Sequence, residues 1–266
     1  MKMKWLLLIV AGVFILSSWQ TCADYRHYWE GAEEFEVTPK MVADGDTFYS
    51  GKKGYRIVGI DTPELHTRVK PKGQLAEEAK EFFEEFTERF SEKILKVGQD
   101  VYGRELVYLF ASDGSSVYFY EASVTEIGLA RPLIYEKNAF PDLILDVVRA
   151  YEEAWKERRG IFSFWESAPL LKKGDNWKKM IGRIVWVEDE IEKVIETGSY
   201  YIARGRFASF LARKDGYRYA FKDFDFHSLK GKKVRVYGEL WEYKGRPEIV
   251  VRAPFEIVVL KGDDEK

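Results

Sequence analysis

The sequence predicts a mixed α+β domain followed by a smaller all-β domain. Residues 35–172 alternate between short strand-like runs and stretches whose apolar residues recur at helical spacing. Beyond residue 177 the pattern changes to short strands separated by turns, which favours a small barrel or sandwich. The chain has 266 residues, 46% of them hydrophobic, so it is long enough to bury a core in each domain.

Residues 1–23 have the pattern of a targeting segment. Lys2 and Lys4 precede an apolar run, and small and polar residues then lead to Ala23. We expect a signal peptide that is cleaved after Ala23 and a secreted, extracellular protein. The alternative is an uncleaved membrane anchor with the domains that follow it outside the membrane. Cys22 raises the option of a lipoprotein, but the three residues before it do not fit a lipobox.

The first domain is expected to begin after a linker over residues 24–34. A strand is predicted over residues 35–43, and residues 47–49 and 55–60 are predicted to form a β-hairpin. Residues 74–90 carry apolar side chains at helical spacing, which predicts an amphipathic helix.

The rest of the first domain continues this alternation. Strands are predicted at residues 94–97 and 105–110, and a short helix from about residue 121 is expected to end at Gly128. Pro141 is expected to open a last helix with an apolar stripe.

The second domain is expected over residues 178–262, with a boundary close to residues 172–176. Its predicted strands cover residues 180–187, 199–207, 217–221, 233–243, 248–252 and 255–260. Residues 24–177 have a net charge of −8, whereas residues 178–266 have a net charge of +4. This difference indicates that the two domains are electrostatically distinct.

Carboxylates and guanidiniums gather around the predicted hairpin. Asp44 and Asp46 point the same way from an extended segment, and Asp61 ends the neighbouring strand, so three carboxylates can meet at one end of the sheet. Such oxygen ligands suit Ca²⁺ or Mg²⁺, and the three histidines are too scattered to offer a zinc site. Arg56 and Arg104 are suited to grip a phosphate.

Glu64 completes the candidate chemistry, because it follows Asp61 by three residues and could activate a water molecule. Each of these motifs alone is more typical of an ordinary turn or helix cap. Together and in this order, they point to hydrolysis of phosphodiester bonds.

Six blocks of this sequence resemble, in the same order, the staphylococcal nuclease (thermonuclease) family. The resemblance covers residues 36–165 and is carried by residues 43–47, 55–64, 76–79, 100–104, 128–130 and 159–162. It implies an OB-like five-stranded barrel with three helices and a calcium-dependent nuclease of DNA and possibly RNA. It further implies products with 3′-phosphate and 5′-hydroxyl ends, and Mg²⁺ is a less favoured cofactor than Ca²⁺.

The resemblance also implies roles for individual residues. Asp46 and Asp61 match direct calcium ligands, the Thr62 carbonyl lies beside them, and Asp44 matches an outer-shell carboxylate. The matches for catalysis and for phosphate binding are Glu64 as general base, Arg56 and Arg104 as the phosphate-gripping pair, and Tyr102 near the terminal phosphate.

Two positions depart from the family pattern. Val101 stands where the family prototype has a lysine, and Ile134 stands where it has a tyrosine that stacks on the nucleotide. Tyr135 can replace that tyrosine only if the register shifts by one residue. Lys70 and Lys72 follow Glu64 and are candidates to restore positive charge near the substrate, or are simply part of a solvated loop.

The second domain resembles an OB-fold, and OB-folds commonly bind single strands through basic grooves and stacking aromatic rings. The candidate binding residues are Arg204, Arg206, Tyr217, Tyr219, Phe221, Tyr237 and Trp241. The aromatic residues among them are equally typical of a barrel core.

Two functions remain open at this point. The first is a secreted metal-dependent nuclease whose partners are DNA, RNA or both, with no stable protein partner and with membrane contact only if the N-terminal segment is uncleaved. The second is a catalytically silent scaffold that binds nucleic acid or protein.

Overall fold

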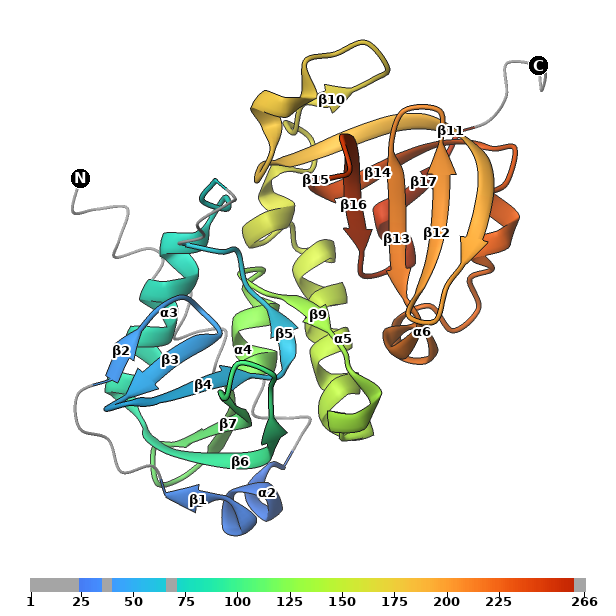
Figure 1. Cartoon of the computed structure of the whole chain (residues 1–266). Coiled ribbons are helices and arrows are strands. Elements are labelled where there is room, and N and C mark those ends of the chain that lie inside the picture. The colour runs from blue at the N-terminus through green and yellow to red at the C-terminus, as the bar shows by residue number, and fades with distance from the viewer. Residues whose placement is uncertain (1–23, 35–39, 66–70, 261–266) are drawn as a thin grey trace.

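The computed structural model describes residues 24–34, 40–65 and 71–260 (Figure 1). The predicted signal segment and Lys70 therefore lie outside the described residues. Two β-sheets lie at opposite ends of the molecule, with the helix α5 (Pro141–Lys156) and the strand β9 (Arg131–Leu133) between them. None of the helices in the described part of the chain is long and apolar enough to cross a membrane.

The first sheet is curled and has seven strands in the order β1-β6-β7-β4-β3-β2, with β8 paired to β7. The strands are β1 (Glu33–Glu34), β2 (Lys40–Val42), β3 (Thr47–Ser50), β4 (Lys53–Ile57), β6 (Ser91–Gln99), β7 (Glu105–Ser112) and β8 (Val117–Phe119). The predicted hairpin is confirmed as the antiparallel pair β3–β4, and β4 also pairs with β7 in parallel. The mixed α+β, OB-like architecture is thus present. Its main sheet has seven strands, two more than the five expected for the barrel.

Three predicted helices of the first domain are confirmed: α3 (Ala76–Arg89), α4 (Tyr120–Glu126) and α5. Apolar spacing decides the inward face of α3, where Ala79, Phe83 and Phe86 are buried. Gly128 follows α4 with φ +74°, a left-handed conformation that glycine adopts without steric cost.

The prediction of a linker over residues 24–34 is wrong, because these residues are part of the first domain. They form the helix α2 (Arg26–Gly31) and the strand β1, which pairs with β6. Tyr25 is buried in the first core and donates a hydrogen bond to Asp146 on α5 at 3.0 Å. The buried side chain of Tyr25 therefore holds this segment in the first domain. The composition of the segment did not suggest that contact.

The second sheet has eight strands in the order β15-β16-β13-β12-β11-β14-β17, with β10 paired to β11. Its strands are β10 (Leu170–Leu171), β11 (Ile184–Glu196), β12 (Tyr200–Gly205), β13 (Ser209–Arg213), β14 (Lys233–Glu239), β15 (Trp241–Tyr243), β16 (Arg246–Val251) and β17 (Ile257–Val259). The long strand β11 pairs with β14 along its first half and with β12 along its second half. This sheet confirms a second, OB-like β domain.

One predicted strand of the second domain is wrong. Residues 217–221 lie mostly in the helix α6 (Lys214–Ala220). Alternating aromatic residues suggested a strand, but Tyr217 stacks on Phe221 at 5.0 Å between ring centroids, which is the i, i+4 contact of a helical turn. Short 3₁₀ turns among the described residues are Glu136–Asn138, Gly160–Phe164, Trp177–Met180, Phe226–Leu229 and Pro254–Glu256.

The two β domains share buried contacts. Tyr151 and Phe162 from the first domain form one hydrophobic cluster with Ile184, Tyr237 and Ala253 from the second. The Tyr237 hydroxyl donates to the backbone carbonyl of Ile161 at 2.6 Å. The predicted boundary near residue 172 therefore crosses a common core, and β10 just before it already belongs to the second sheet.

The small strand β5 (Gly59–Asp61) lies at this junction and pairs with β9 in an antiparallel ladder. In that ladder Asp61 is opposite Arg131. The acidic end of the first sheet thus faces the second domain.

Candidate active site

The turn between β2 and β3 brings Asp44 and Asp46 to the end of the first sheet. Gly45 lies between them in a place where a Cβ atom would come within 2.9 Å of the Ala79 and Thr62 side chains. The buried Tyr120 hydroxyl donates to the Gly45 carbonyl at 2.6 Å. Close packing against two helices therefore requires glycine here and fixes both carboxylates.

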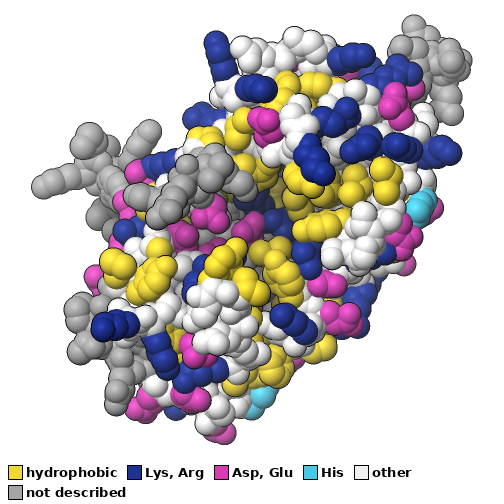
Figure 2. Space-filling model, viewed as in Figure 1, with side chains coloured by type: hydrophobic (Ala, Val, Ile, Leu, Met, Phe, Trp, Pro, Cys, Tyr) yellow, Lys and Arg dark blue, Asp and Glu magenta, His cyan; other side chains and the backbone are white. Residues whose placement is uncertain are grey.

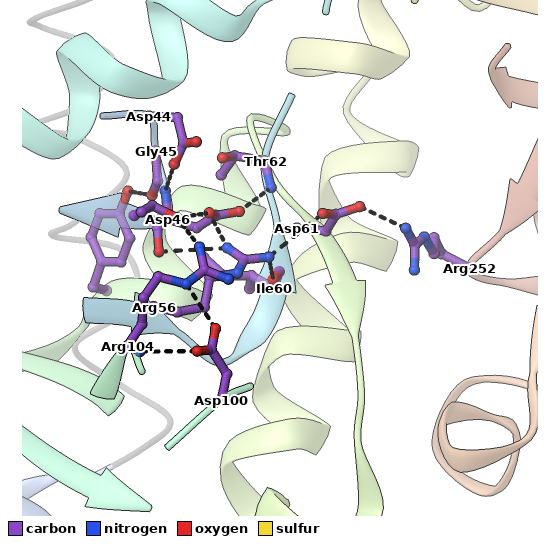
Figure 3. A network of polar contacts seen from close by, with 12 residues as sticks. Asp44, Gly45, Asp46, Arg56, Ile60, Asp61, Thr62, Asp100, Arg104 and Arg252 are labelled. Carbon is purple, nitrogen blue, oxygen red and sulfur yellow. Dashed lines mark hydrogen bonds and ion pairs between the residues drawn. The ribbon is translucent and has the colours of Figure 1, made fainter. Parts of the chain in front are cut away.

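Asp46 is the buried centre of the site (Figure 3). One of its oxygens accepts from the Thr47 hydroxyl at 3.0 Å and forms an ion pair with Arg56. The other oxygen accepts from the backbone N–H of Thr62 at 2.8 Å. These contacts join the turn after β2, the strand β4 and the end of β5 at a single carboxylate.

Arg56 extends from β4 and joins the backbone of β5. Its Nη2 donates to the Ile60 carbonyl at 3.2 Å and lies 3.6 Å from Oδ1 of Asp61. Burial lowers the pKa of the Arg56 guanidinium, and the charge of Asp61 opposes that effect. An arginine remains charged in proteins, so Arg56 places a fixed positive charge in the site.

Arg104 immediately precedes the strand β7, which lies next to β4 in the sheet. Its Nε donates to Asp100 at 2.7 Å, and its Nη1 lies 3.4 Å from the Thr47 hydroxyl. Burial raises the pKa of Asp100, but hydrogen bonds from Arg104 and from the Tyr102 backbone outweigh it and lower the pKa overall. Arg104 is thus held by Asp100, a residue to which sequence reasoning gave no role.

Asp44 and Glu64 lie beside this group. Burial raises the pKa of Asp44, against the opposing positive charge of Arg56. Glu64 follows β5, and its backbone carbonyl accepts from Gly73 at 2.9 Å. The negative charge of Glu64 also acts to raise the pKa of Arg56, which places the carboxylate within electrostatic reach of the guanidinium.

Asp61 has a partner that sequence reasoning missed. Its Oδ2 accepts from Nη2 of Arg252, in the second domain, at 2.7 Å (Figure 3). These two residues are 191 positions apart in the chain. Such a separation leaves no spacing pattern that could have predicted the contact.

A second ion pair crosses the junction close to Asp61. Arg131, opposite Asp61 in the β5–β9 ladder, pairs with Glu239 at the end of β14. Both side chains are almost completely buried, with exposed fractions of 7% and 1%. The second domain therefore contributes one positive side chain, Arg252, and one negative side chain, Glu239, to the region of the site.

The donor types of the site fit a hard cation, but their arrangement does not. Across residues 24–34, 40–65 and 71–260, no group of three or more His, Cys, Asp or Glu side chains is placed to hold a metal ion. Asp46 pairs with Arg56, and Asp61 pairs with both Arg56 and Arg252. Guanidiniums thus lie where the predicted calcium ligands would meet an ion.

The predicted substrate-binding residues lie at different distances from this centre. Tyr102 is 83% exposed, and together with Arg104 it lines a surface pocket of about 440 Å³. Lys72 forms an ion pair with Glu77 at the start of α3. Tyr102 is therefore placed to contact a substrate bound at Arg104, whereas the charge of Lys72 is already compensated.

Tyr135 rather than Ile134 is exposed, and its role in substrate binding stays a prediction. Ile134 is buried at 3% exposure, and Tyr135 is 42% exposed. The guanidinium of Arg213, from the second domain, lies 4.2 Å from the Tyr135 ring centroid. A cation–π contact therefore covers part of this ring.

The predicted binding residues of the second domain do not form a stacking platform. Tyr237 and Tyr219 are buried at 1% and 8% exposure, so their rings cannot receive a base, and that prediction is wrong for both. Tyr217 and Phe221 pack against the second core. The hydrophobic clusters of the second domain and of the shared junction use these aromatic rings, which was the alternative that the sequence left open.

The remaining candidates of the second domain are only partly accessible. Arg206 pairs with Glu190 at 2.8 Å, and Arg204 and Trp241 are half-buried on β12 and β15. Figure 2 shows Lys and Arg side chains over the surface of this half of the molecule, interspersed with Asp and Glu. The positive net charge is therefore spread and partly paired.

The curled sheet, its helices and the paired arginines define a nuclease-type fold. Residues 55–166 match the family model described as staphylococcal nuclease homologue. The chain is also 28% identical over 167 residues to the uncharacterized protein MJ1439 of Methanocaldococcus jannaschii. That similarity covers 53% of this chain and 78% of the archaeal protein.

Proposed function

We propose that this protein is a nuclease that hydrolyses phosphodiester bonds of DNA, and possibly of RNA, to 3′-phosphate and 5′-hydroxyl products. The observation that carries the proposal is the convergence of Arg56 and Arg104 beside Thr47 and Asp46. The parallel pairing of β4 with β7 produces this convergence, because it aligns Arg56 with Leu106, two residues after Arg104. Two fixed guanidiniums can bind one phosphate group and stabilise the additional charge of its transition state.

Glu64 supplies the proton acceptor in this proposal. Its carboxylate takes a proton from a water molecule, and the resulting hydroxide attacks phosphorus as the bond to the 5′ oxygen breaks. The leaving oxygen takes a proton from solvent and becomes the 5′-hydroxyl. Arg56 and Arg104 hold the phosphate throughout, and Tyr102 contacts the substrate from the exposed turn before β7.

We further infer that activity depends on a divalent cation, with Ca²⁺ preferred over Mg²⁺. The support is the donor types of Asp46, Asp61 and the Thr62 carbonyl, with Asp44 nearby, because calcium prefers hard oxygen donors. For Asp46 and Asp61 to bind an ion, Arg56 and Arg252 first have to leave them. Cation binding and ion-pair opening are therefore coupled in this proposal.

The decisive experiment is an incubation of the full chain with single- and double-stranded DNA and RNA, in Ca²⁺, in Mg²⁺ and in excess chelator. We expect cleavage with Ca²⁺, less with Mg²⁺ and none with chelator, and end-group analysis should give 3′-phosphates. Cleavage that chelator leaves undiminished would disprove the cation requirement. No cleavage of any substrate would disprove the nuclease.

A catalytically silent scaffold that binds nucleic acid or protein is the second candidate. The observation that favours it is the ion pairing of Asp46 and Asp61 with arginines, which neutralises both carboxylates without a cation. The same incubation separates the two candidates, since a scaffold retains nucleic acid in a binding assay but leaves it intact.

We also propose that the mature protein begins near Asp24 and is exported, with a membrane-anchored form as the alternative. The first core includes Tyr25, so cleavage after Ala23 would leave every described core residue in place. Mass spectrometry of the native protein tests this proposal. An intact N-terminus in the membrane fraction would instead establish an anchor, and a lipid on Cys22 would establish a lipoprotein.

A further inference from the structure

Asp61 lies in an unusually positive environment for a residue proposed to bind a cation. Arg56 is 3.6 Å from one of its oxygens, and Arg252 is 2.7 Å from the other. Arg131 is opposite Asp61 in the β5–β9 ladder. Charges this close to a carboxylate weaken the binding of a cation, because like charges repel most strongly where water is excluded.

Arg252 differs from the other two arginines in its origin and in its attachment. It follows β16 in the second domain, and its side chain is 10% exposed. Its Nη2 donates to Asp61, while its buried Nε has no hydrogen-bond partner among the described residues. By contrast, Arg131 is paired with the buried Glu239. Arg252 is therefore the guanidinium that can leave Asp61 with the smallest loss of other contacts.

The structure offers Arg252 a place to move. A cavity of about 260 Å³ between the two domains is lined by Arg252, by Tyr151 and Glu152 of α5, and by Phe255. Figure 2 shows a hollow between the two halves of the molecule with Lys or Arg side chains in its depth. The Glu152 carboxylate offers a second anionic partner at the edge of the same cavity.

We propose that Arg252 competes with a divalent cation for Asp61, so that the second β domain sets the cation affinity of the nuclease site. This inference rests on the proposed function. Arg252 acts through Asp61 and is a positioning residue. When a cation binds Asp61, the guanidinium turns into the interdomain cavity, and when the cation leaves, the ion pair forms again.

Calorimetric titration of the full chain with CaCl₂ tests the competition directly. Arg252→Gln removes the charge and keeps a hydrogen-bond donor, and we expect it to bind Ca²⁺ about tenfold more tightly than the wild type. Arg252→Lys keeps the charge and should stay close to the wild type. Equal or weaker binding by Arg252→Gln would overturn the proposal.

Arg235→Gln is the matched control. Arg235 also belongs to the second domain and donates to a carboxylate, that of Glu188, at the same distance of 2.7 Å. It lies in β14 on the ladder with β11, and its side chain pairs with a residue of its own domain. We expect unchanged Ca²⁺ affinity in this variant, and an equal gain in both variants would overturn a specific role for Arg252.

Hydrogen–deuterium exchange of the wild-type protein gives a test that needs no variant to fold. Binding is reciprocal, so an ion that displaces Arg252 must loosen the segment that carries it. We expect peptides covering residues 246–256 to exchange faster in saturating Ca²⁺. Unchanged or slower exchange in that segment would contradict the competition.

The outcomes also distinguish this inference from the proposed function. If the wild type binds Ca²⁺ and cleaves DNA but Arg252→Gln binds with the same affinity, the inference alone fails. If neither protein binds Ca²⁺ and no substrate is cleaved, the proposed function fails and the inference fails with it.

Discussion

The two β domains of this protein repeat one order of elements and use it differently. In the first, β2, β3 and β4 are followed by the helix α3 and then by β6 and β7, and β4 pairs with β7 in parallel. In the second, β11, β12 and β13 are followed by the helix α6 and then by β14 and β16, and β13 pairs with β16 in parallel. The two domains thus share one parallel strand pair, but they differ in the partner of the strand after the helix, because β6 pairs with β7 whereas β14 pairs with β11.

The difference lies in what occupies those turns. The turn between β2 and β3 of the first domain holds Asp44, Gly45 and Asp46, whereas the connection between β11 and β12 holds Thr197, Gly198 and Ser199. The arginine at the start of the last parallel strand also differs in its partners. Arg104 contacts a carboxylate and a hydroxyl, but Arg246 donates to the backbone carbonyl of Gly205 at 2.8 Å. In the first domain these charged side chains pair with one another, whereas Arg246 of the second domain holds the backbone of its own sheet.

Glu188 illustrates the second use of charge. This buried carboxylate on β11 forms ion pairs with Lys172, Lys233 and Arg235. The net charge of +4 for residues 178–266 therefore does not describe a free basic groove. A net charge summed along the sequence therefore overestimates the positive charge that is available to bind a ligand, because it also counts cations that are paired across strands.

Among the tests of this difference between the two domains, we expect Glu64→Gln to have the largest effect, a loss of cleavage rate. If the chemistry belongs to the first domain, loss of the proton acceptor should slow turnover by about 10²–10⁴-fold, measured as initial cleavage rate at saturating substrate. Glu78→Gln, a change at an exposed position on α3, is the control and should leave the rate unchanged. A small effect of Glu64→Gln would assign Glu64 a structural role.

Glu239→Ala tests whether the two domains depend on each other. It leaves Arg131 buried without its partner, and breaking a buried ion pair in this way costs about 3–5 kcal/mol of unfolding free energy. Chemical denaturation measures the change. Glu242→Ala, at an exposed position on the following strand, should change stability by less than about 0.5 kcal/mol. Equal effects would mean that the junction does not stabilise the fold.

Arg104→Ala should slow cleavage by about 10²-fold while the protein remains folded, because the transition state loses a fixed guanidinium. Arg104 is a cleaner probe than Arg56, whose removal also leaves the buried Asp46 without its ion pair. Arg149→Ala removes a largely exposed arginine on α5 and should keep the wild-type rate. If Arg104→Ala retained full activity, the silent-scaffold alternative for the first domain would gain support.

The smallest predicted effect concerns Glu188 and pH. Burial raises the pKa of Glu188, but hydrogen bonds from Arg235, Lys233 and Lys172 outweigh it and lower the pKa to about 2. A lowered folded-state pKa stabilises the protein above the ordinary value of 4.5, and that stabilisation is lost as the pH falls toward 2.

Glu188→Gln should therefore reduce stability by about 1 kcal/mol at neutral pH, because the three cations are largely exposed and screened. The difference from the wild type should disappear in thermal melts near pH 2. A constant difference at every pH would show that packing rather than charge is responsible.

Local patterns in the sequence were sufficient for much of the first domain. Apolar spacing predicted α3 and α5, and the hairpin of β3 and β4 followed from its turn and alternation. The acidic turn and the arginines of the proposed site belong to segments whose residue types alone indicate phosphate chemistry. Their roles remain predictions, but the structure brings Asp46, Arg56 and Asp61 into direct contact.

Local patterns failed where distant segments decide the environment of a side chain. Tyr217 and Tyr219 alternate as strand residues do, yet they lie in α6, whose aromatic side chains pack on the second core and on α5. The acidic segment 24–34 resembled a linker, yet Tyr25 anchors it in the first core. Packing in three dimensions overrode the local preference in both cases.

The sequence by itself determined most elements of the first domain and the kinds of side chain at the proposed site, because hydrophobic periodicity and donor chemistry are local properties. Only the tertiary structure decided that Arg252 and Glu239 of the second domain reach Asp61 and Arg131 of the first. Those contacts join residues more than one hundred positions apart, and the pairing of buried charges depends on how two complete barrels pack together. The physical reason is that electrostatic partners are selected by distance in space, which no spacing along the chain specifies.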